Sequence, residues 1–312
     1  MTPQNLFFER VAILGVGLIG ASLALGLRAQ SLAGKVVGYG RTEDNLKRAL
    51  ATGIIDSYFL DSRKAVEDAD LVVLCTPVGT FRQLVLDIAP RLKRGAVVTD
   101  VGSVKGDLVY DMESLMPGVA SYVGSHPITG SDRSGIDDAR SDLFEGALCI
   151  ITPTGKSSPE TLRTVTALWE DLGSTVTMVD AHRHDEIYAA VSHLPHVAAY
   201  ALVNTVEELC PGSVTYAGKG FRDATRIALS SAVLWADIAL FNRDNIIRLS
   251  GQLRRNLADI EAHLESGDSE ALREIFERAR TIRMSITDAA DITRDWPPSG
   301  GSFDSTVADQ GL

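Results

Sequence analysis

The chain has 312 residues, a formal net charge of −11 at pH 7 and a hydrophobic content of 45%. This length is enough for two domains, and the composition is that of a globular protein. The negative charge argues against nucleic acid or an anionic membrane as the main partner, although a local positive cluster can still bind an anionic ligand. The three cysteines are isolated and odd in number, which argues against a disulfide framework and favours a cytoplasmic location.

Three glycines near the N-terminus have the spacing G-x-G-x-x-G: Gly15, Gly17 and Gly20. They lie between an apolar run over 11–15, which predicts a buried strand, and a segment over 18–29, which predicts a helix. This is the context in which the motif indicates dinucleotide binding. The glycines permit the tight turn, the approach of a pyrophosphate and close packing of helix on strand. The pyrophosphate is expected at the helix N-terminus, next to Leu18 and Ile19.

The apolar stretch over 11–29 also resembles a signal peptide in position and length. The fixed glycine pattern favours a phosphate-binding turn instead, and Glu9 is out of place in a positively charged leader. No stretch has the length and apolarity expected of a transmembrane helix.

Apolar runs alternate with helical segments as far as residue 180. Strands are predicted over 35–39, 70–75, 96–100, 121–125, 147–152 and 175–179, and helices over 43–52, 80–90 and 159–172. This alternation predicts an α/β fold, a Rossmann-type doubly wound and mostly parallel sheet over residues 1–180. Thr76 and Pro77, which end the strand over 70–75, are expected to contact the cofactor.

The pattern changes near Asp180, and residues 181–290 predict an all-helical domain. We expect a helix kinked at Pro195, a glycine-rich loop over 211–221, a long helix over 230–265 and a last helix over 269–286. Apolar residues form one stripe on the long helix: Leu234, Ile238, Phe241, Leu249, Leu253, Leu257, Ile260 and Leu264. So large a stripe on few helices predicts a homodimer. Residues 291–312 are predicted to form a flexible tail.

The residues after the second strand bear on the choice of nicotinamide cofactor. An acidic residue there would bond the ribose 2′-hydroxyl and favour NAD, but this chain has Gly40, followed by Arg41 and Thr42. An arginine and a hydroxyl can bind a 2′-phosphate, so NADP is favoured. NAD remains the alternative, because Arg41 can stack on the adenine and Asp44 is close by.

Ligands of this fold bind beyond the carboxyl ends of the strands. His126 follows the strand predicted over 121–125 and can accept a proton from a substrate hydroxyl as hydride leaves. Ser103 can bond the same hydroxyl, and Arg226 can clamp a carboxylate. The structural alternatives are a loop histidine bonded to the main chain, a helix-capping serine, and an ion pair between Arg226 and Asp223.

His193 and His196 are three residues apart in the helical half. A metal site is conceivable with His182 and His184, but the spacing matches no standard zinc pattern. Contact with substrate or with a second subunit is favoured, and no metal site is predicted.

Several segments together make a specific resemblance: the glycine motif, Asp100-x-Gly102-Ser103-x-Lys105, His126-Pro127-x-x-Gly130, Ser192-His193-Leu194-Pro195-His196 and Gly220-Phe221-Arg222-Asp223-x-Thr225-Arg226. Over residues 8–290 the chain resembles the prephenate dehydrogenases of bacterial tyrosine biosynthesis, a family that also includes arogenate and cyclohexadienyl dehydrogenases. The resemblance implies a Rossmann domain followed by a helical dimerisation domain. It also implies oxidative decarboxylation of prephenate to 4-hydroxyphenylpyruvate, with hydride transfer to NAD(P)+. We expect neither a mutase domain before residue 11 nor a regulatory domain after residue 290.

The resemblance also implies roles for single residues. His126 would be the catalytic histidine, with Ser103 orienting it; Arg226 would bind a carboxylate and His196 the substrate side chain. Asp132 and Asp223 would form an ionic gate with Arg226, although many relatives have the longer Glu in place of Asp132. The other expected substrate contacts are Ser131, Ser192, His193, Thr225 and Trp235.

Other functions stay open. Arogenate is the alternative substrate; the presence of His196 favours prephenate within the family. Another dehydrogenase of this architecture, such as a 3-hydroxy-acid dehydrogenase or an imine reductase, would use a lysine of the helical half, where Lys219 is the one nearby. A dinucleotide-sensing regulator would need neither His126 nor the arginine clamp.

Overall fold

The structure is a computed structural model, and it describes residues 7–129 and 135–286. Strands and helices alternate in its first part: β1 Phe8–Leu14, α1 Leu18–Ala29, β2 Ala33–Tyr39, α2 Glu43–Ala51, β3 Ser57–Phe59, α3 Ser62–Ala65, β4 Leu71–Leu74, α4 Phe81–Ile88, β5 Val97–Asp100, α5 Gly106–Leu115, β6 Ser121–Tyr122, β7 Gly124–Ile128, β8 Leu148–Thr152, α6 Pro159–Asp171 and β9 Thr175–Met178. The predicted helices of this part are present, as are the predicted strands except the one over 121–125, and β3, α3 and α5 are additional.

The main sheet has six strands in the order β3-β2-β1-β4-β5-β6, all parallel. The order reverses at β1, which pairs with β2 on one side and β4 on the other. In open α/β sheets, ligands bind in the crevice at this reversal, outside the carboxyl ends of the strands. The fold therefore places Gly15, directly after β1, where a dinucleotide is expected.

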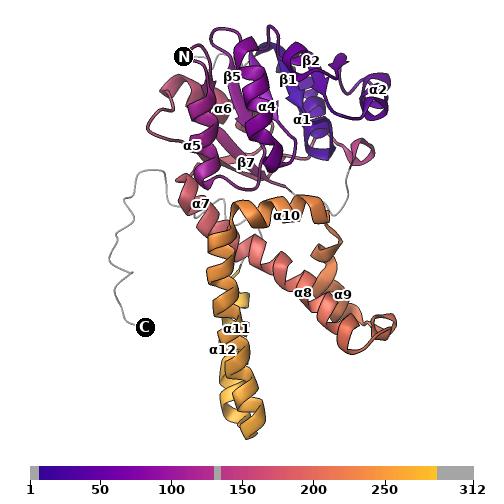
Figure 1. The fold of residues 1–312 in the computed structure, drawn as a ribbon, viewed down its shortest axis with the longest axis vertical. Helices are drawn as coiled ribbons and strands as arrows, with labels where there is room; N and C mark the ends of the chain where they lie inside the picture. The colour runs from indigo at the N-terminus through magenta and orange to yellow at the C-terminus, as the bar shows by residue number, and fades with distance from the viewer. Residues whose placement is uncertain (1–6, 130–134, 287–312) are drawn as a thin grey trace.

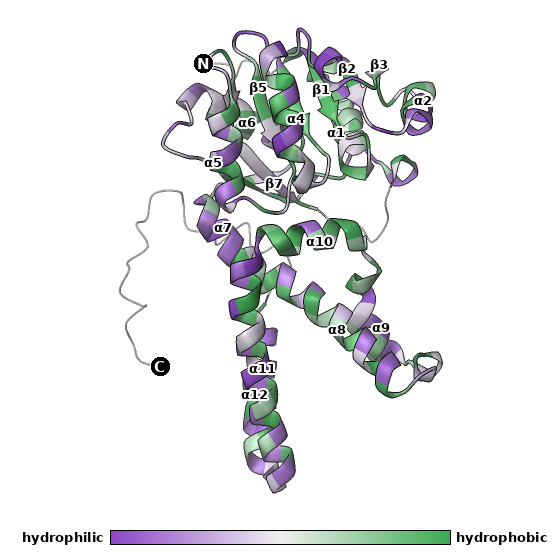
Figure 2. Cartoon of the chain, viewed as in Figure 1, coloured by the Kyte–Doolittle hydropathy of each residue, from purple (hydrophilic) through white to green (hydrophobic). Residues whose placement is uncertain are grey.

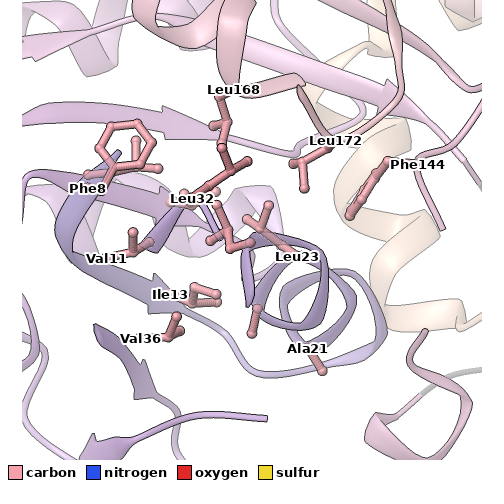
Figure 3. Close-up of a cluster of buried hydrophobic side chains, with 14 of the residues drawn as sticks. Phe8, Val11, Ile13, Ala21, Leu23, Leu32, Val36, Phe144, Leu168 and Leu172 are labelled. Carbon is pink, nitrogen blue, oxygen red and sulfur yellow. The ribbon is translucent and has the colours of Figure 1, made fainter. Parts of the chain in front are cut away.

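Both faces of the main sheet are buried, which explains why its strands are continuous apolar runs. Along β1, Val11 and Ile13 belong to one buried cluster, and Ala12 and Leu14 belong to another. Side chains alternate between the two faces of a strand, so each face of β1 packs against its own layer of helices. Figure 3 shows the first cluster, in which Leu23 of α1, Leu168 of α6 and Leu172, which directly follows α6, pack beside the strand residues.

A second sheet has three strands in the order β7-β8-β9. The strand predicted over 121–125 is in fact two strands, because β6 pairs with β5 whereas β7 pairs antiparallel with β8. The prediction that His126 follows a strand is therefore wrong: it lies within β7, opposite Ile150. The sequence gives no local signal for the change of sheet, which depends on pairing with residues about 25 positions further along the chain.

The second part consists of helices: α7 Ala181–Tyr188, a π-helical turn Ala189–His193, α8 Leu194–Leu209, α9 Lys219–Thr225, α10 Ala232–Phe241, α11 Arg243–Ser266 and α12 Ser269–Met284. In Figure 1, α10 lies across the lower side of the α/β part, and two arms, α8 with α9 and α11 with α12, diverge below it. Among the described residues no single helix is long and apolar enough to cross a membrane, although one bent pair passes by length and composition.

Three details differ from the expectations for the helices. The predicted helix over 230–265 is two helices that meet at Asn242, which is buried and bonded to residues of α7 and the π turn. Pro195 lies in the first turn of α8, directly after the π turn, where its missing N–H cannot bond to the carbonyl of Val191. The predicted loop over 211–221 contains a short 3₁₀ turn and the start of α9.

Candidate active site

The glycine turn after β1 shows why each glycine is needed. Gly15 has φ +113°, and a Cβ atom there would lie 2.6 Å from the Cys75 carbonyl carbon and 2.8 Å from the amide nitrogen of Thr76. A Cβ on Gly20 would lie 2.1 Å from the Gly15 carbonyl oxygen. A Cβ on Gly17, in contrast, would meet nothing within 4 Å. Gly15 and Gly20 are therefore required by the protein's own packing, whereas Gly17 faces open space that fits an approaching pyrophosphate.

The start of α1 supplies the hydrogen-bond donors for such a ligand. Gly17 is the N-cap residue and has no side chain to bond the first helical N–H groups. The main-chain N–H groups of Leu18 and Ile19 lie in this first turn, where no carbonyl of the helix can reach them. Thr76 and Pro77 adjoin the turn from the end of β4. Free N–H groups and the positive end of the helix dipole together favour an anionic group.

The end of β2 is the other expected cofactor contact. Tyr39 ends the strand, and Arg41 and Thr42 follow Gly40 with exposed side chains. Thr42 occupies the N-cap position of α2, but its side chain accepts no hydrogen bond from the helix. Both residues therefore follow the carboxyl end of β2, where the adenosine end of a dinucleotide binds in this fold.

His126 lies at the centre of a buried group of rings. Its side chain is 8% exposed, and its ring lies 4.9 Å from that of Tyr188 and 5.1 Å from that of His184. Burial lowers the pKa of His126 well below its usual range, and the nearby His184, Lys105 and His193 lower it further. His126 therefore stays neutral at physiological pH, which a general base requires.

His184 and Asp185 connect to His126, and sequence analysis missed this connection. Nδ1 of His126 lies 2.8 Å from Nε2 of His184, whose Nδ1 lies 2.8 Å from Oδ1 of Asp185. The main-chain N–H of Lys105 donates to the same Asp185 oxygen at 2.8 Å. The sequence suggests His184 only as a candidate metal ligand. Within 7–129 and 135–286, no group of three or more His, Cys, Asp or Glu side chains could hold a metal ion.

Lys105 is itself buried, and it pairs with Asp100. Asp100 also accepts a hydrogen bond at 2.6 Å from the Tyr122 hydroxyl and another at 2.6 Å from the Gly102 N–H. These contacts fix the segment between β5 and α5, which carries Ser103. The glycine at 102 leaves room for Asp100, because a Cβ there would lie 2.9 Å from Oδ1 of that carboxylate.

His193 lies in the π turn beside His126. Its Nδ1 accepts a hydrogen bond from Nδ2 of Asn242 at 3.0 Å, so its Nε2 carries the proton. Nε2 is buried and has no hydrogen-bond partner; the Ser103 main chain is near the ring but outside bonding geometry. Burial lowers the pKa of His193 to about 4. A buried donor without a partner indicates a place for a ligand acceptor.

His196, Trp235 and Arg226 are brought together from three separate segments. The rings of His196 and Trp235 stack with centroids 3.5 Å apart, and the rings of Trp235 and His193 are T-shaped with centroids 5.9 Å apart. Burial lowers the pKa of His196, a bond to the Ser192 carbonyl raises it, and the charge of Arg226 lowers it. Arg226 is exposed and close enough for its charge to be felt at His196. The stacked rings of His196 and Trp235 thus lie near the positive charge of Arg226.

Within 7–129 and 135–286, the side chains of the other predicted substrate contacts have no hydrogen bond or ring contact with His126, His193 or Trp235. Ser192 bonds to His196 through its carbonyl, and the buried Thr225 donates its hydroxyl proton to the Phe221 carbonyl of its own helix at 2.7 Å. Asp223 is exposed. Ser131 and Asp132 lie outside the described residues, as does the predicted tail over 291–312.

Comparison with known proteins identifies the family of the chain. The family model for the nucleotide-binding domain of prephenate dehydrogenase matches residues 23–178, and the model for its dimerization domain matches residues 180–278. The cyclohexadienyl dehydrogenase of Zymomonas mobilis is 32% identical over 289 residues, which are 91% of this chain and 98% of that protein.

Two solved structures are also similar. The prephenate dehydrogenase from A. aeolicus in complex with hydroxyphenyl propionate and NAD+ has a TM-score of 0.85 and 35% identity, covering 91% of this chain and all of that one. The arogenate dehydrogenase of Synechocystis has a TM-score of 0.74 and 27% identity, covering 88% of this chain and 99% of that one. The chain therefore belongs to the prephenate dehydrogenase family.

Proposed function

We propose that the protein oxidises and decarboxylates prephenate to 4-hydroxyphenylpyruvate, a step of tyrosine biosynthesis. The observation that supports this most is the position of a buried, neutral His126 next to the group of His193, His196, Trp235 and Arg226. It offers a base for the ring hydroxyl, aromatic surfaces for a flat ring and a cation for a carboxylate. Family membership supports the same reaction.

The chain's own residues then have distinct roles. A bound nicotinamide dinucleotide supplies the hydride acceptor. His126 accepts the proton of the 4-hydroxyl as hydride leaves the carbon that bears it, and Ser103 orients that hydroxyl. Arg226 binds a carboxylate, His196 contacts the side chain, and the N–H of His193 is free to donate to substrate or cofactor. Loss of carbon dioxide and aromatisation of the ring drive the reaction forward, so the acid–base help needed is modest.

Arogenate is the alternative substrate, because it differs from prephenate only in having an amino group in place of the side-chain keto group. A cyclohexadienyl dehydrogenase that accepts both is equally compatible with these residues. We favour prephenate because His196 is present, and members of the family that are specific for arogenate often lack it.

NADP is our proposed cofactor, with NAD as the alternative. Support comes from the exposed Arg41 and from the Thr42 hydroxyl, which accepts no hydrogen bond from α2. Both residues follow β2, and no carboxylate occupies position 40. Arg41→Ala should weaken NADP binding and leave NAD binding within about threefold; equal losses for the two cofactors would indicate stacking on the adenine instead.

We also propose that the protein is a homodimer in the cytoplasm. The matched family model is named a dimerization domain, and the helical part exposes many large apolar side chains, among them Val233 and Leu240 of α10 and Ile247 and Leu264 of α11. Figure 2 shows α10 as an almost wholly apolar helix. Apolar surface of this extent indicates a protein interface. Sedimentation at micromolar concentration should give twice the chain mass of 33.5 kDa; a monomer would contradict the dimer. The unpaired cysteines are compatible with a cytoplasmic location.

The experiment that tests the reaction is a two-by-two grid of purified protein with prephenate or arogenate and NAD+ or NADP+. Formation of the reduced cofactor is followed by absorbance, and 4-hydroxyphenylpyruvate or tyrosine is identified in the product. Activity with prephenate and NADP+ is expected. Activity with arogenate alone would overturn the proposed substrate, and activity with NAD+ alone would overturn the proposed cofactor. No activity from folded dimer would overturn the proposed reaction.

A further inference from the structure

We propose that His184 and Asp185 are positioning residues that set the tautomer of His126, so that its Nε2 carries the lone pair that faces the reaction. This inference concerns two residues to which the proposed function gives no role. Its catalytic consequence rests on the proposed function, but the tautomer itself can be measured without any turnover.

The direction of the hydrogen bonds that link His126, His184 and Asp185 follows from the carboxylate of Asp185. An ionised carboxylate can only accept, so Oδ1 of Asp185 receives a bond from Nδ1–H of His184, 2.8 Å away. Nε2 of His184 is then without a proton and must accept. It therefore receives the bond from Nδ1–H of His126, also at 2.8 Å. A neutral imidazole has one N–H, so Nε2 of His126 is left as the acceptor.

Each member of this chain is held in place by independent contacts. The main-chain N–H of Lys105 donates to Oδ1 of Asp185, and Nδ2 of Asn242 donates to the Asp185 carbonyl at 2.8 Å. The ring of Tyr188 packs against both imidazoles, 4.9 Å from His126 and 4.6 Å from His184. His184 is fully buried, so water cannot replace it as the partner of His126. Neither imidazole can then turn without breaking a buried hydrogen bond, which is costly.

The arrangement has a second consequence for the reaction. When Nε2 of His126 takes up the substrate proton, the ring becomes an imidazolium in a buried site next to the positively charged Lys105. The Asp185 carboxylate is the negative group at the far end of the chain of contacts, and it stabilises this cation through His184. In a serine-protease triad, loss of the orienting carboxylate costs ~10⁴-fold in kcat. We expect a smaller loss here, because a second imidazole separates the carboxylate from the base.

The first test is the protonation pattern of the rings. Nitrogen-15 NMR of protein labelled in its six histidines reports which ring nitrogen carries the proton, and a His126→Gln variant identifies the signals of His126. At pH 7.5 without ligands, His126 should be protonated on Nδ1. Protonation on Nε2 in the wild-type protein would overturn the proposal whether or not the protein oxidises prephenate.

The second test uses variants. His184→Leu removes the acceptor, so the Nε2–H form of His126 should appear, and kcat should fall about 100-fold while KM and cofactor Kd change less than threefold. His184→Gln keeps an acceptor for Nδ1–H and should restore most of the kcat and the wild-type tautomer. Asp185→Asn keeps an oxygen for Lys105 and removes only the charge, so its kcat should lie between the two.

His182→Gln is the matched control, since His182 is an exposed histidine on the same helix, α7, stacked on Tyr110. It should keep the wild-type kcat and tautomer. Equal losses in His182→Gln and His184→Leu, or a His184→Leu variant with wild-type kcat and tautomer, would overturn the proposal. A wild-type protein with the expected tautomer but no activity in the substrate grid would instead overturn the proposed function.

Discussion

Replacing Gly17 and Gly20 one at a time by alanine separates cofactor binding from folding. The two glycines are three residues apart on the same turn, yet an added methyl group meets very different surroundings. At Gly20 it would lie 2.1 Å from the Gly15 carbonyl oxygen and 2.9 Å from Cγ2 of Ile13. At Gly17 it would have no neighbour within 4 Å, and the residue has φ −99°, which alanine can adopt.

The expected magnitudes follow from these distances. Gly20 lies within α1, where alanine is the better helix former by about 1 kcal/mol. Overpacking usually costs ~1–3 kcal/mol, and here the obstacle is a main-chain carbonyl that cannot turn away, so a net loss of at least ~3 kcal/mol is expected. At ~2–4 °C per kcal/mol, Gly20→Ala should lower Tm by roughly 6–12 °C. Gly17→Ala should change stability by less than ~1 kcal/mol and Tm by at most about 4 °C.

The assay is thermal unfolding of both variants together with fluorescence titration of the reduced cofactor. Gly17→Ala should keep its Tm and bind the cofactor at least about tenfold more weakly, a loss of ~1.4 kcal/mol. Wild-type affinity in Gly17→Ala would refute the idea that this residue faces the pyrophosphate. A wild-type Tm in Gly20→Ala would refute the packing of the turn.

Three further predictions concern substrate, cofactor and pH. Arg226→Ala should raise KM for prephenate at least tenfold with little change in kcat, measured by initial rates. An unchanged KM would refute the proposal that Arg226 binds a substrate carboxylate. Arg41→Ala should raise Kd for NADPH about tenfold in the same titration and spare NADH, since Arg41 is placed for a 2′-phosphate. Burial lowers the pKa of His126, His184 and His193, so below about pH 6.5 the unfolded chain binds more protons than the folded one. Stability is therefore present at neutral pH and lost as pH falls, by up to ~1.4 kcal/mol per pH unit for each histidine. Tm should be lower at pH 5.5 than at 7.5, and a Tm that is constant or rises on acidification would contradict this.

The parts of the fold that local patterns determine were predictable. The glycine spacing, the continuous apolar strands and the helices over 18–29 and 159–172 depend on residues close together in sequence, and the structure confirms them. Where tertiary contacts decide, prediction failed. The break of the long helix at Asn242 depends on hydrogen bonds to Asp185 and His193, more than 45 residues away. The change of sheet between β6 and β7 depends on pairing with β8 in the same way.

The candidate site shows the same limit. Residue type and position singled out His126, Arg226, His196 and Trp235, and the structure brings the last three together with His193 beside His126. The hydrogen bonds that link His126 to Asp185 through His184 were not predictable, because they join a strand to a helix 58 residues further on. The adjacent pair His184–Asp185 just after a helix start was the one visible signal, and nothing in the sequence assigns it to His126.

The central claim is that His126 is the base that accepts the hydroxyl proton, and one comparison tests it most directly. The rate of reduced-cofactor formation from saturating prephenate is measured for the wild-type protein and for His126→Asn, after cofactor Kd and Tm are shown to agree between them. A positioned base contributes ~10²–10⁴-fold, so kcat should fall by about that factor. A kcat within threefold of wild type, from a folded variant with normal cofactor affinity, would contradict the account.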